Sequence, residues 1–315
     1  MRRTSLKVLG SPGDNVGPRG ITASDGTLAM ATATDLGVLS VHFDGGRCHV
    51  RCPFCYLGER EGTAQSGVPV ALLSETLALL PYQELAIALS EPIGPALDPL
   101  GRLTAVAQQR GKLVTVTTTV AAALALPAEA WQGIGRLNLS VDPQKGQWQA
   151  PVGQVVPSDL AGALRQLPSA LEKVLIVTLS SEDFAEQLFS GLLAQLVALP
   201  EVHRVALSGL KPPPPWCDSK FWLRSLSRIG GLLREQLDKR LFLDCYVAAR
   251  ILHLGGCPAR PDLSPTSKEE SVNGRLAFRS CVYQPRADWV VESASALAEQ
   301  LTDFVPPARC PFPIH

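Results

Sequence analysis

The chain has 315 residues, and its 29 lysines and arginines are balanced by 29 aspartates and glutamates, so the formal net charge is zero. This balance disfavours nucleic acid as a partner, because proteins that grip phosphate backbones carry an excess of positive charge. Apolar residues make up 46% and charged residues 18%, which argues against disorder and allows a sizeable core. At about 150 residues per domain, this length allows two domains or one large barrel.

The start of the chain gives no sign of a membrane partner. No stretch reaches the roughly 18 consecutive apolar residues that cross a bilayer. The basic residues Arg2 and Arg3 are not followed by the apolar region of a signal peptide. We therefore expect a cytoplasmic protein. In that compartment thiols stay reduced, so cysteines that cluster are more often metal ligands or catalytic groups than disulfides.

Residues 1–35 are rich in Gly, Pro, Ser, Thr and Asp and show no sustained hydrophobic period, which predicts an irregular N-terminal arm. From residue 36 onward, short runs rich in Val, Ile, Leu and Thr alternate with amphipathic stretches. Such runs are typical of strands that are buried on both faces. They occupy residues 37–43, 84–89, 113–119, 136–141, 173–179, 204–207 and 241–247.

The stretches between these runs predict helices. Apolar residues recur every three to four positions over 184–197, behind Ser181 as a candidate amino-terminal cap, and again over 222–237. The alternation predicts an α/β fold with a parallel sheet and right-handed crossovers, arranged as an open or partial barrel over residues 36–248. Residues 249–315 are expected to form a C-terminal extension, irregular over 249–290 and ending in a helix near 292–304.

The informative motif follows the first predicted strand, where Cys48, Cys52 and Cys55 form a C-x3-C-x2-C pattern. Three thiolates on one loop can converge on a single inorganic centre. A cubane [4Fe–4S] cluster usually takes four thiolates, so three leave one iron open to a non-protein ligand. A zinc site with His49 as fourth ligand is an alternative, although His49 directly follows Cys48, and two adjacent residues do not easily bind the same ion. Three unrelated buried cysteines are the other alternative.

With Phe54 directly before the third cysteine, this motif resembles the cluster motif of the radical S-adenosylmethionine (radical SAM) superfamily. The resemblance implies a partial (β/α)6 TIM-type barrel with its chemistry at the carboxyl ends of the strands. It implies that Cys48, Cys52 and Cys55 hold a [4Fe–4S] cluster whose fourth iron is chelated by the amino and carboxylate groups of S-adenosylmethionine. Reductive cleavage would then give a 5′-deoxyadenosyl radical that abstracts hydrogen from the substrate. The electron would come from a donor such as flavodoxin or ferredoxin.

The resemblance also nominates residues that hold S-adenosylmethionine. After the second strand the family has Gly-Gly-Glu-Pro, and here Ser90 and Glu91 precede Pro92, so the carboxylate is kept while both glycines are replaced. The loss of glycine puts the close backbone approach in doubt. The alternative role of Glu91 is that of a solvated loop acid.

Four further candidates lie at the ends of the third and fourth predicted strands. Thr117, Thr119, Ser140 and Asp142 alternate with apolar residues and could point into the barrel, where the family binds the ribose and the methionine carboxylate. Asp142 could instead begin a turn. The resemblance gives Phe54 a role in shielding the cluster or packing near the adenine, and ordinary aromatic packing is the alternative.

The later cysteines suggest a second site. Cys257 and Cys281 flank Gly274 in a pattern that resembles the auxiliary-cluster extensions (twitch or SPASM type) of some radical SAM enzymes. The match is loose, because six residues rather than four separate Gly274 from Cys281. Cys217 and Cys245 could complete the ligand set. Alternatively, several of these residues are buried thiols that behave as small apolar side chains.

The sequence thus favours a radical SAM enzyme that modifies, oxidises or crosslinks a small molecule or a peptide. It nominates no hydrogen-donor or acid–base residue. The alternative is a non-enzymatic iron–sulfur electron-transfer or metal-binding protein that uses the same cysteines.

Overall fold

The computed structural model describes part of the chain, and the irregular arm predicted over residues 1–35 lies outside that part. A ten-stranded sheet dominates it, in the order β12-β11-β10-β1-β2-β3-β4-β7-β8-β9. The described residues are 36–43, 69–89, 94–141, 149–150, 154–210, 215–236, 240–244, 247, 262–265, 275–281, 287–302 and 304.

All seven predicted strands are present and pair in parallel, which confirms the α/β fold. They follow one another across the sheet in chain order, as expected when each strand is joined to the next by a crossover. The last of them ends at Leu243, earlier than predicted. The seven strands are β1 (Val38–Phe43), β2 (Glu84–Leu89), β3 (Leu113–Thr119), β4 (Arg136–Val141), β7 (Glu172–Leu179), β8 (Arg204–Gly209) and β9 (Leu241–Leu243).

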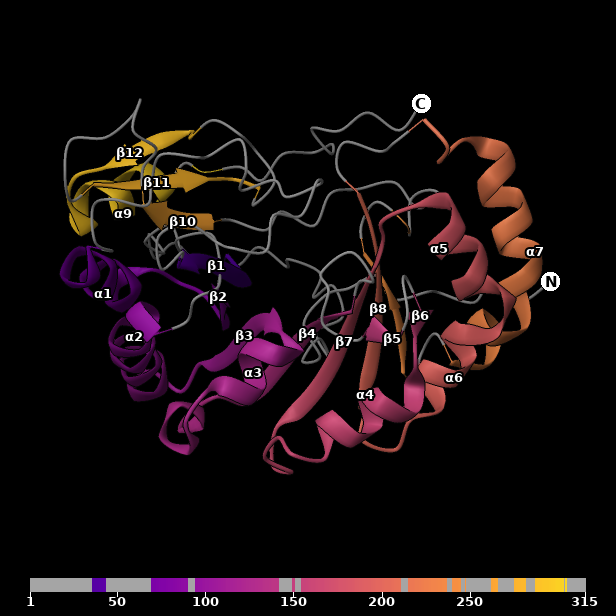
Figure 1. Cartoon of the computed structure of the whole chain (residues 1–315). Helices are drawn as coiled ribbons and strands as arrows, with labels where there is room; N and C mark the ends of the chain where they lie inside the picture. Colours follow the sequence, from indigo (N-terminus) through magenta and orange to yellow (C-terminus); the bar gives the residue numbers. More distant parts are fainter. Residues whose placement is uncertain are drawn as a thin grey trace, which may run out of the picture.

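The helices lie along the outer rim of the curved sheet (Figure 1). Alternate strand residues such as Leu39, Ile87 and Leu139 are fully buried and join helix residues such as Leu73 and Leu103 in one hydrophobic core. Short elements complete this part of the chain. The helices and short elements are α1 (Val70–Leu79), η3 (Gly94–Ala96), α2 (Leu97–Gln109), α3 (Val120–Ala125), η4 (Ala128–Trp131), β5 (Gln149–Ala150), β6 (Gln154–Val155), α4 (Pro157–Leu164) and α7 (Ser219–Gln236).

The helix predicted over 184–197 is interrupted. Ser181 caps it as expected, its Oγ accepting a hydrogen bond from the Phe184 amide at 3.2 Å. The segment then divides into α5 (Glu182–Gln187), a π-helical turn η6 (Leu188–Leu192) and α6 (Leu193–Ala198). Gly191 causes the break, because its φ of 140° is a conformation that only glycine adopts readily. The apolar stripe survives because Leu188, Leu192 and Leu196 stay buried on both sides of the break.

The C-terminal extension contains more regular structure than the sequence predicted. Three strands form within the stretch expected to be irregular: β10 (Asp262–Pro265), β11 (Leu276–Arg279) and β12 (Trp289–Val291). β10 pairs in parallel with β1, whereas β11 and β12 add antiparallel strands beyond it. The predicted final helix is α9 (Ala294–Thr302).

The sheet is open in the part of the chain that the structure describes, where no pairing joins β9 to β12. This agrees with a partial rather than a closed barrel. Among the described residues, no helix has both the length and the apolar character needed to cross a membrane.

Candidate functional site

The sheet has one face that packs against the helices and an inner face that is only partly covered. On the inner face, the side chains of Ala88, Thr117, Asn138 and Ser140 are half-buried, while their neighbours along each strand are buried in the core. This alternation follows from the period of two in a strand, which sends successive side chains to opposite faces. The inner face therefore carries half-buried side chains, several of them polar, at the carboxyl ends of these strands.

Three of the residues nominated from the sequence meet on this face. Strand pairing places Thr119 beside Ser140 and Thr117 beside Asn138, at the carboxyl ends of β3 and β4. The Asn138 amide Nδ2 donates a hydrogen bond to Thr117 Oγ1 at 3.2 Å. The structure thus gathers hydroxyl and amide groups where parallel α/β proteins bind ligands.

Thr119 also has a structural role. Its side-chain oxygen accepts a hydrogen bond from the Ala122 amide at 3.2 Å and so caps helix α3. A cap acceptor satisfies an amide that the helix itself leaves unpaired.

Replacing Thr119 by valine should therefore lower the free energy of unfolding by about 1 kcal/mol, because the shape is kept and the cap is lost. Thr119→Ser keeps the acceptor and serves as the control, with stability close to the wild type. Urea unfolding followed by circular dichroism measures both variants. A valine variant as stable as the serine variant would show that the cap is not stabilising.

A second polar group lies at the ends of β8 and β9 and was not nominated from the sequence. Asp244 is buried and accepts three hydrogen bonds, from Ser208 Oγ at 2.8 Å, the Gly209 amide at 3.0 Å and the Val247 amide at 2.8 Å. These bonds tie the end of β8 to the segment after β9. The available signal was an acidic residue, Asp244, inside the apolar run predicted over 241–247.

The opposite, amino-terminal end of the inner face carries a network of charged side chains. Arg136 donates from Nη1 to Glu84 at 3.0 Å and from Nε to Glu172 at 2.9 Å, and Arg204 Nε lies 2.8 Å from Glu172. Thr115 Oγ1 donates to the second oxygen of Glu84 at 2.7 Å. Two acids and two bases neutralise one another, so this end of the inner face presents a closed, balanced network.

Shifted pKa values occur away from the carboxyl ends of the strands. Burial raises the pKa of Tyr82 and lowers the pKa of Lys173. Hydrogen bonding by its own backbone amide, followed by the contact with Arg165, lowers the pKa of the Glu201 carboxyl. Among the described residues, these shifts identify no acid or base beside Thr117 and Ser140.

Of the remaining nominated residues, two are described by the structure and the others are not. Cys217 and Cys281 are buried, the first just before α7 and the second just after β11, near opposite ends of the strand order. Within the described ranges, no group of three or more His, Cys, Asp or Glu side chains is arranged to hold a metal. The nominated residues outside those ranges are Cys48, Cys52, Phe54, Cys55, Ser90, Glu91, Asp142, Cys245 and Cys257.

Together, the fold and the inner face define an α/β protein with an open, barrel-like parallel sheet and polar side chains at its carboxyl edge. Solved structures of Streptococcus suis SuiB share this fold. SuiB bound to the precursor peptide SuiA aligns with a TM-score of 0.58 and 14% identity, over 86% of this chain and 65% of SuiB. SuiB bound to S-adenosylmethionine aligns with a TM-score of 0.54 and 12% identity, over 79% and 59%.

A third SuiB structure gives a TM-score of 0.56 at 13% identity, over 86% of this chain and 66% of SuiB. The chain thus spans about three fifths to two thirds of the SuiB chains. No family model and no curated protein sequence matches it.

Proposed function

We propose that this protein is a radical SAM enzyme that acts on a peptide or a small molecule. Cys48, Cys52 and Cys55 would hold a [4Fe–4S] cluster, which together with S-adenosylmethionine supplies a 5′-deoxyadenosyl radical for hydrogen abstraction. One observation carries the proposal: this three-cysteine motif lies in the connection that follows the carboxyl end of β1 in a parallel α/β sheet. Ligands of such sheets bind at the carboxyl ends of the strands.

The described residues suit the binding of S-adenosylmethionine at this edge. Thr117, Asn138 and Ser140 offer neutral donors and acceptors to ribose hydroxyls and to a carboxylate. The charged network around Arg136 closes the amino-terminal end of the inner face. A ligand would therefore enter from the carboxyl end of the strands, the end at which β1 leads into the segment that carries the cysteine motif.

A peptide is the favoured substrate class. SuiB, which shares this fold, has been solved with its precursor peptide. The electron would be supplied by a partner such as flavodoxin or ferredoxin.

The decisive experiment measures 5′-deoxyadenosine formed by anaerobically reconstituted protein with S-adenosylmethionine and dithionite. The wild type should form this product, and Cys48→Ala should form none, because an open-iron cluster needs all three thiolates. Cys310→Ala, which changes a cysteine outside the motif, is the matched control and should remain active. Iron binding without product, even in the wild type, would instead support an electron-transfer protein.

We also propose that Cys257 and Cys281 belong to an auxiliary cluster. Cys217 and Cys245 follow β8 and β9, at the other end of the strand order from Cys281, and are not assigned to it. Iron and sulfide analysis of the reconstituted wild type should then give about eight irons per chain, against about four for a single cluster. The double variant Cys257→Ala/Cys281→Ala should fall to about four irons and keep the cluster of the first motif. About four irons in both proteins would rule out the auxiliary cluster.

A further inference from the structure

The carboxyl ends of β7, β8 and β9 carry polar side chains that the proposed binding of S-adenosylmethionine does not use. Ser208 on β8 is half-buried, and strand pairing places it beside Thr178 on β7. Asp244 directly follows β9 and is hydrogen-bonded to Ser208. These residues lie on the far side of β4 from Thr117, so they form a second polar region at the same edge of the sheet.

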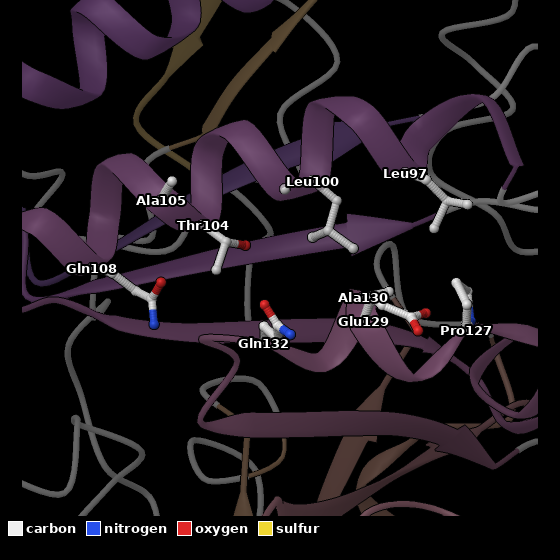
Figure 2. A pocket seen from close by; sticks show the side chains of 10 residues that line it. Leu97, Leu100, Thr104, Ala105, Gln108, Pro127, Glu129, Ala130 and Gln132 are labelled. Carbon is white, nitrogen blue, oxygen red and sulfur yellow. The ribbon is translucent and has the colours of Figure 1, made fainter.

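The register of the strands places this region on the inner face. Ser140 pairs with Ile176, and Thr178 lies two residues further along β7, so it points to the same face as Ser140. Thr178 in turn pairs with Ser208. The groove between α2 and η4 is not part of this region, because its lining comes from these two elements and the residues beside η4, with no strand residue (Figure 2).

The Asp244 carboxylate fixes the role of the Ser208 hydroxyl. Its Oδ2 accepts hydrogen bonds from Ser208 Oγ at 2.8 Å and from the Gly209 amide at 3.0 Å, and its Oδ1 accepts one from the Val247 amide at 2.8 Å. The two backbone amides hold the carboxylate in place. A serine hydroxyl has one proton and two lone pairs. Because this proton is given to a carboxylate, Ser208 Oγ can only accept a further hydrogen bond, and the negative charge makes it a stronger acceptor.

Thr178 adds a second hydroxyl beside this acceptor. It is half-buried, and among the described residues its side chain has no hydrogen-bond partner, so it can donate or accept. Neighbouring strands lie about 4.8 Å apart, so one small group can contact both side chains. Such a group must offer a hydrogen-bond donor to Ser208. An amide N–H or a hydroxyl does so, whereas a carboxylate or a tertiary amide does not.

We propose that Ser208 binds a hydrogen-bond donor of the substrate, either an amide N–H or a hydroxyl, and that Asp244 is the positioning residue that makes Ser208 an acceptor. Thr178 contacts the same substrate group from β7. This assignment rests on the proposed function and adds a requirement to it, namely that a substrate presents a donor at this point. Since Thr117 and Ser140 are assigned to S-adenosylmethionine, the β7 and β8 end of the edge is left for the substrate.

The test measures the binding of three small probes to the full-length, reconstituted protein in the presence of S-adenosylmethionine. The methylamide of acetylalanine carries N–H donors, the dimethylamide of lactic acid carries only a hydroxyl donor, and the dimethylamide of acetyl-N-methylalanine carries none. The methyl signal of ¹³C-labelled Thr178 reports occupancy. A probe with a donor should bind about tenfold more tightly than the donor-free probe, which corresponds to about 1.4 kcal/mol. The tighter of the two donor probes identifies the source of the donor.

Two variants separate the hydrogen bond from the size of the probes and from damage to the fold. Ser208→Ala should abolish the preference for a donor, whereas a preference caused by probe size would survive. Asp244→Asn should reduce the preference, because the Ser208 proton is no longer given to a carboxylate. A ratio of two affinities does not depend on the fraction of folded protein, so a loss of stability alone leaves it unchanged. Ser227→Ala, at an exposed position on α7, is the matched control and should keep the tenfold ratio.

Two results would overturn the proposal: no shift of the Thr178 signal with any probe, or a preference for donors that persists in Ser208→Ala. Formation of 5′-deoxyadenosine is measured separately in the same wild-type preparation. If this product is absent while the preference for a donor holds, the proposed reaction is wrong and the binding site stands. If the product forms without any preference, the reaction stands and the assignment of Ser208 is wrong.

Discussion

Replacing Arg136 by alanine should lower the free energy of unfolding by about 3–5 kcal/mol, because it leaves two carboxylates without their shared cation in a largely buried site. The Arg136 side chain is 10% exposed and bonds to both Glu84 and Glu172. Glu172 keeps its contact with Arg204, whereas Glu84 keeps, among the residues that the structure describes, only the hydroxyl of Thr115. Most of the loss should therefore come from Glu84.

Urea unfolding of the wild type and variant measures this difference. Arg102→Ala is the matched control, since its ion pair with Asp98 lies on the exposed side of α2 and should contribute about 0.3–0.5 kcal/mol. Adding Glu84→Gln to Arg136→Ala should recover part of the lost free energy of unfolding, because it removes the buried carboxylate that Arg136→Ala leaves without a cation. If Arg136→Ala were as mild as Arg102→Ala, the network would not stabilise the fold.

A second large effect is expected at Phe278, which is fully buried in β11. Its ring stacks on Trp289 at a centroid distance of 5.0 Å and meets Phe304 edge-on at 5.7 Å. Trp289 and Phe304 contact each other at 5.8 Å, so the three rings form a closed cluster. Phe278→Ala should therefore lower the free energy of unfolding by about 3–5 kcal/mol.

The loss should be concentrated in the C-terminal extension, because the cluster joins β11, β12 and Phe304, which lies two residues after the end of α9. Limited proteolysis should cut Phe278→Ala within this extension before the rest of the sheet. Val290→Ala, at an exposed position on β12, is the control and should change stability by less than about 0.5 kcal/mol. Uniform proteolysis along the chain would show that the extension does not unfold separately.

The strands of the parallel sheet were predictable because they are buried on both faces. Runs such as 84–89 and 136–141 are apolar enough to stand out, and their bounds match β2 and β4. The bounds of β10, β11 and β12 were not predicted, because each strand has only three or four residues, too few to establish a period. The break at Gly191 was hidden because the apolar stripe continues across it.

The candidate site was predictable only where the alternation of side chains within a single strand shows which face a residue occupies. Alternation placed Thr117 and Ser140 on one face, and strand pairing confirms that placement. The pair of Arg136 with Glu84 joins residues 52 positions apart on strands that are not neighbours, so it depends on sheet order and register. Neither property can be read from one sequence before the fold is known.

The pairing of β10 with β1 ties the sheet together across most of the chain and has a consequence during synthesis. Ser40 meets Asp262, about 220 residues further along the chain, whereas β2 becomes available much earlier. During synthesis, one edge of β1 therefore has no strand partner until β10 emerges, after all the strands from β2 to β9. Contacts this distant form slowly, and unpaired strand edges invite aggregation. A chain whose translation stops before β10 should therefore be aggregation-prone and should need chaperones to stay in solution.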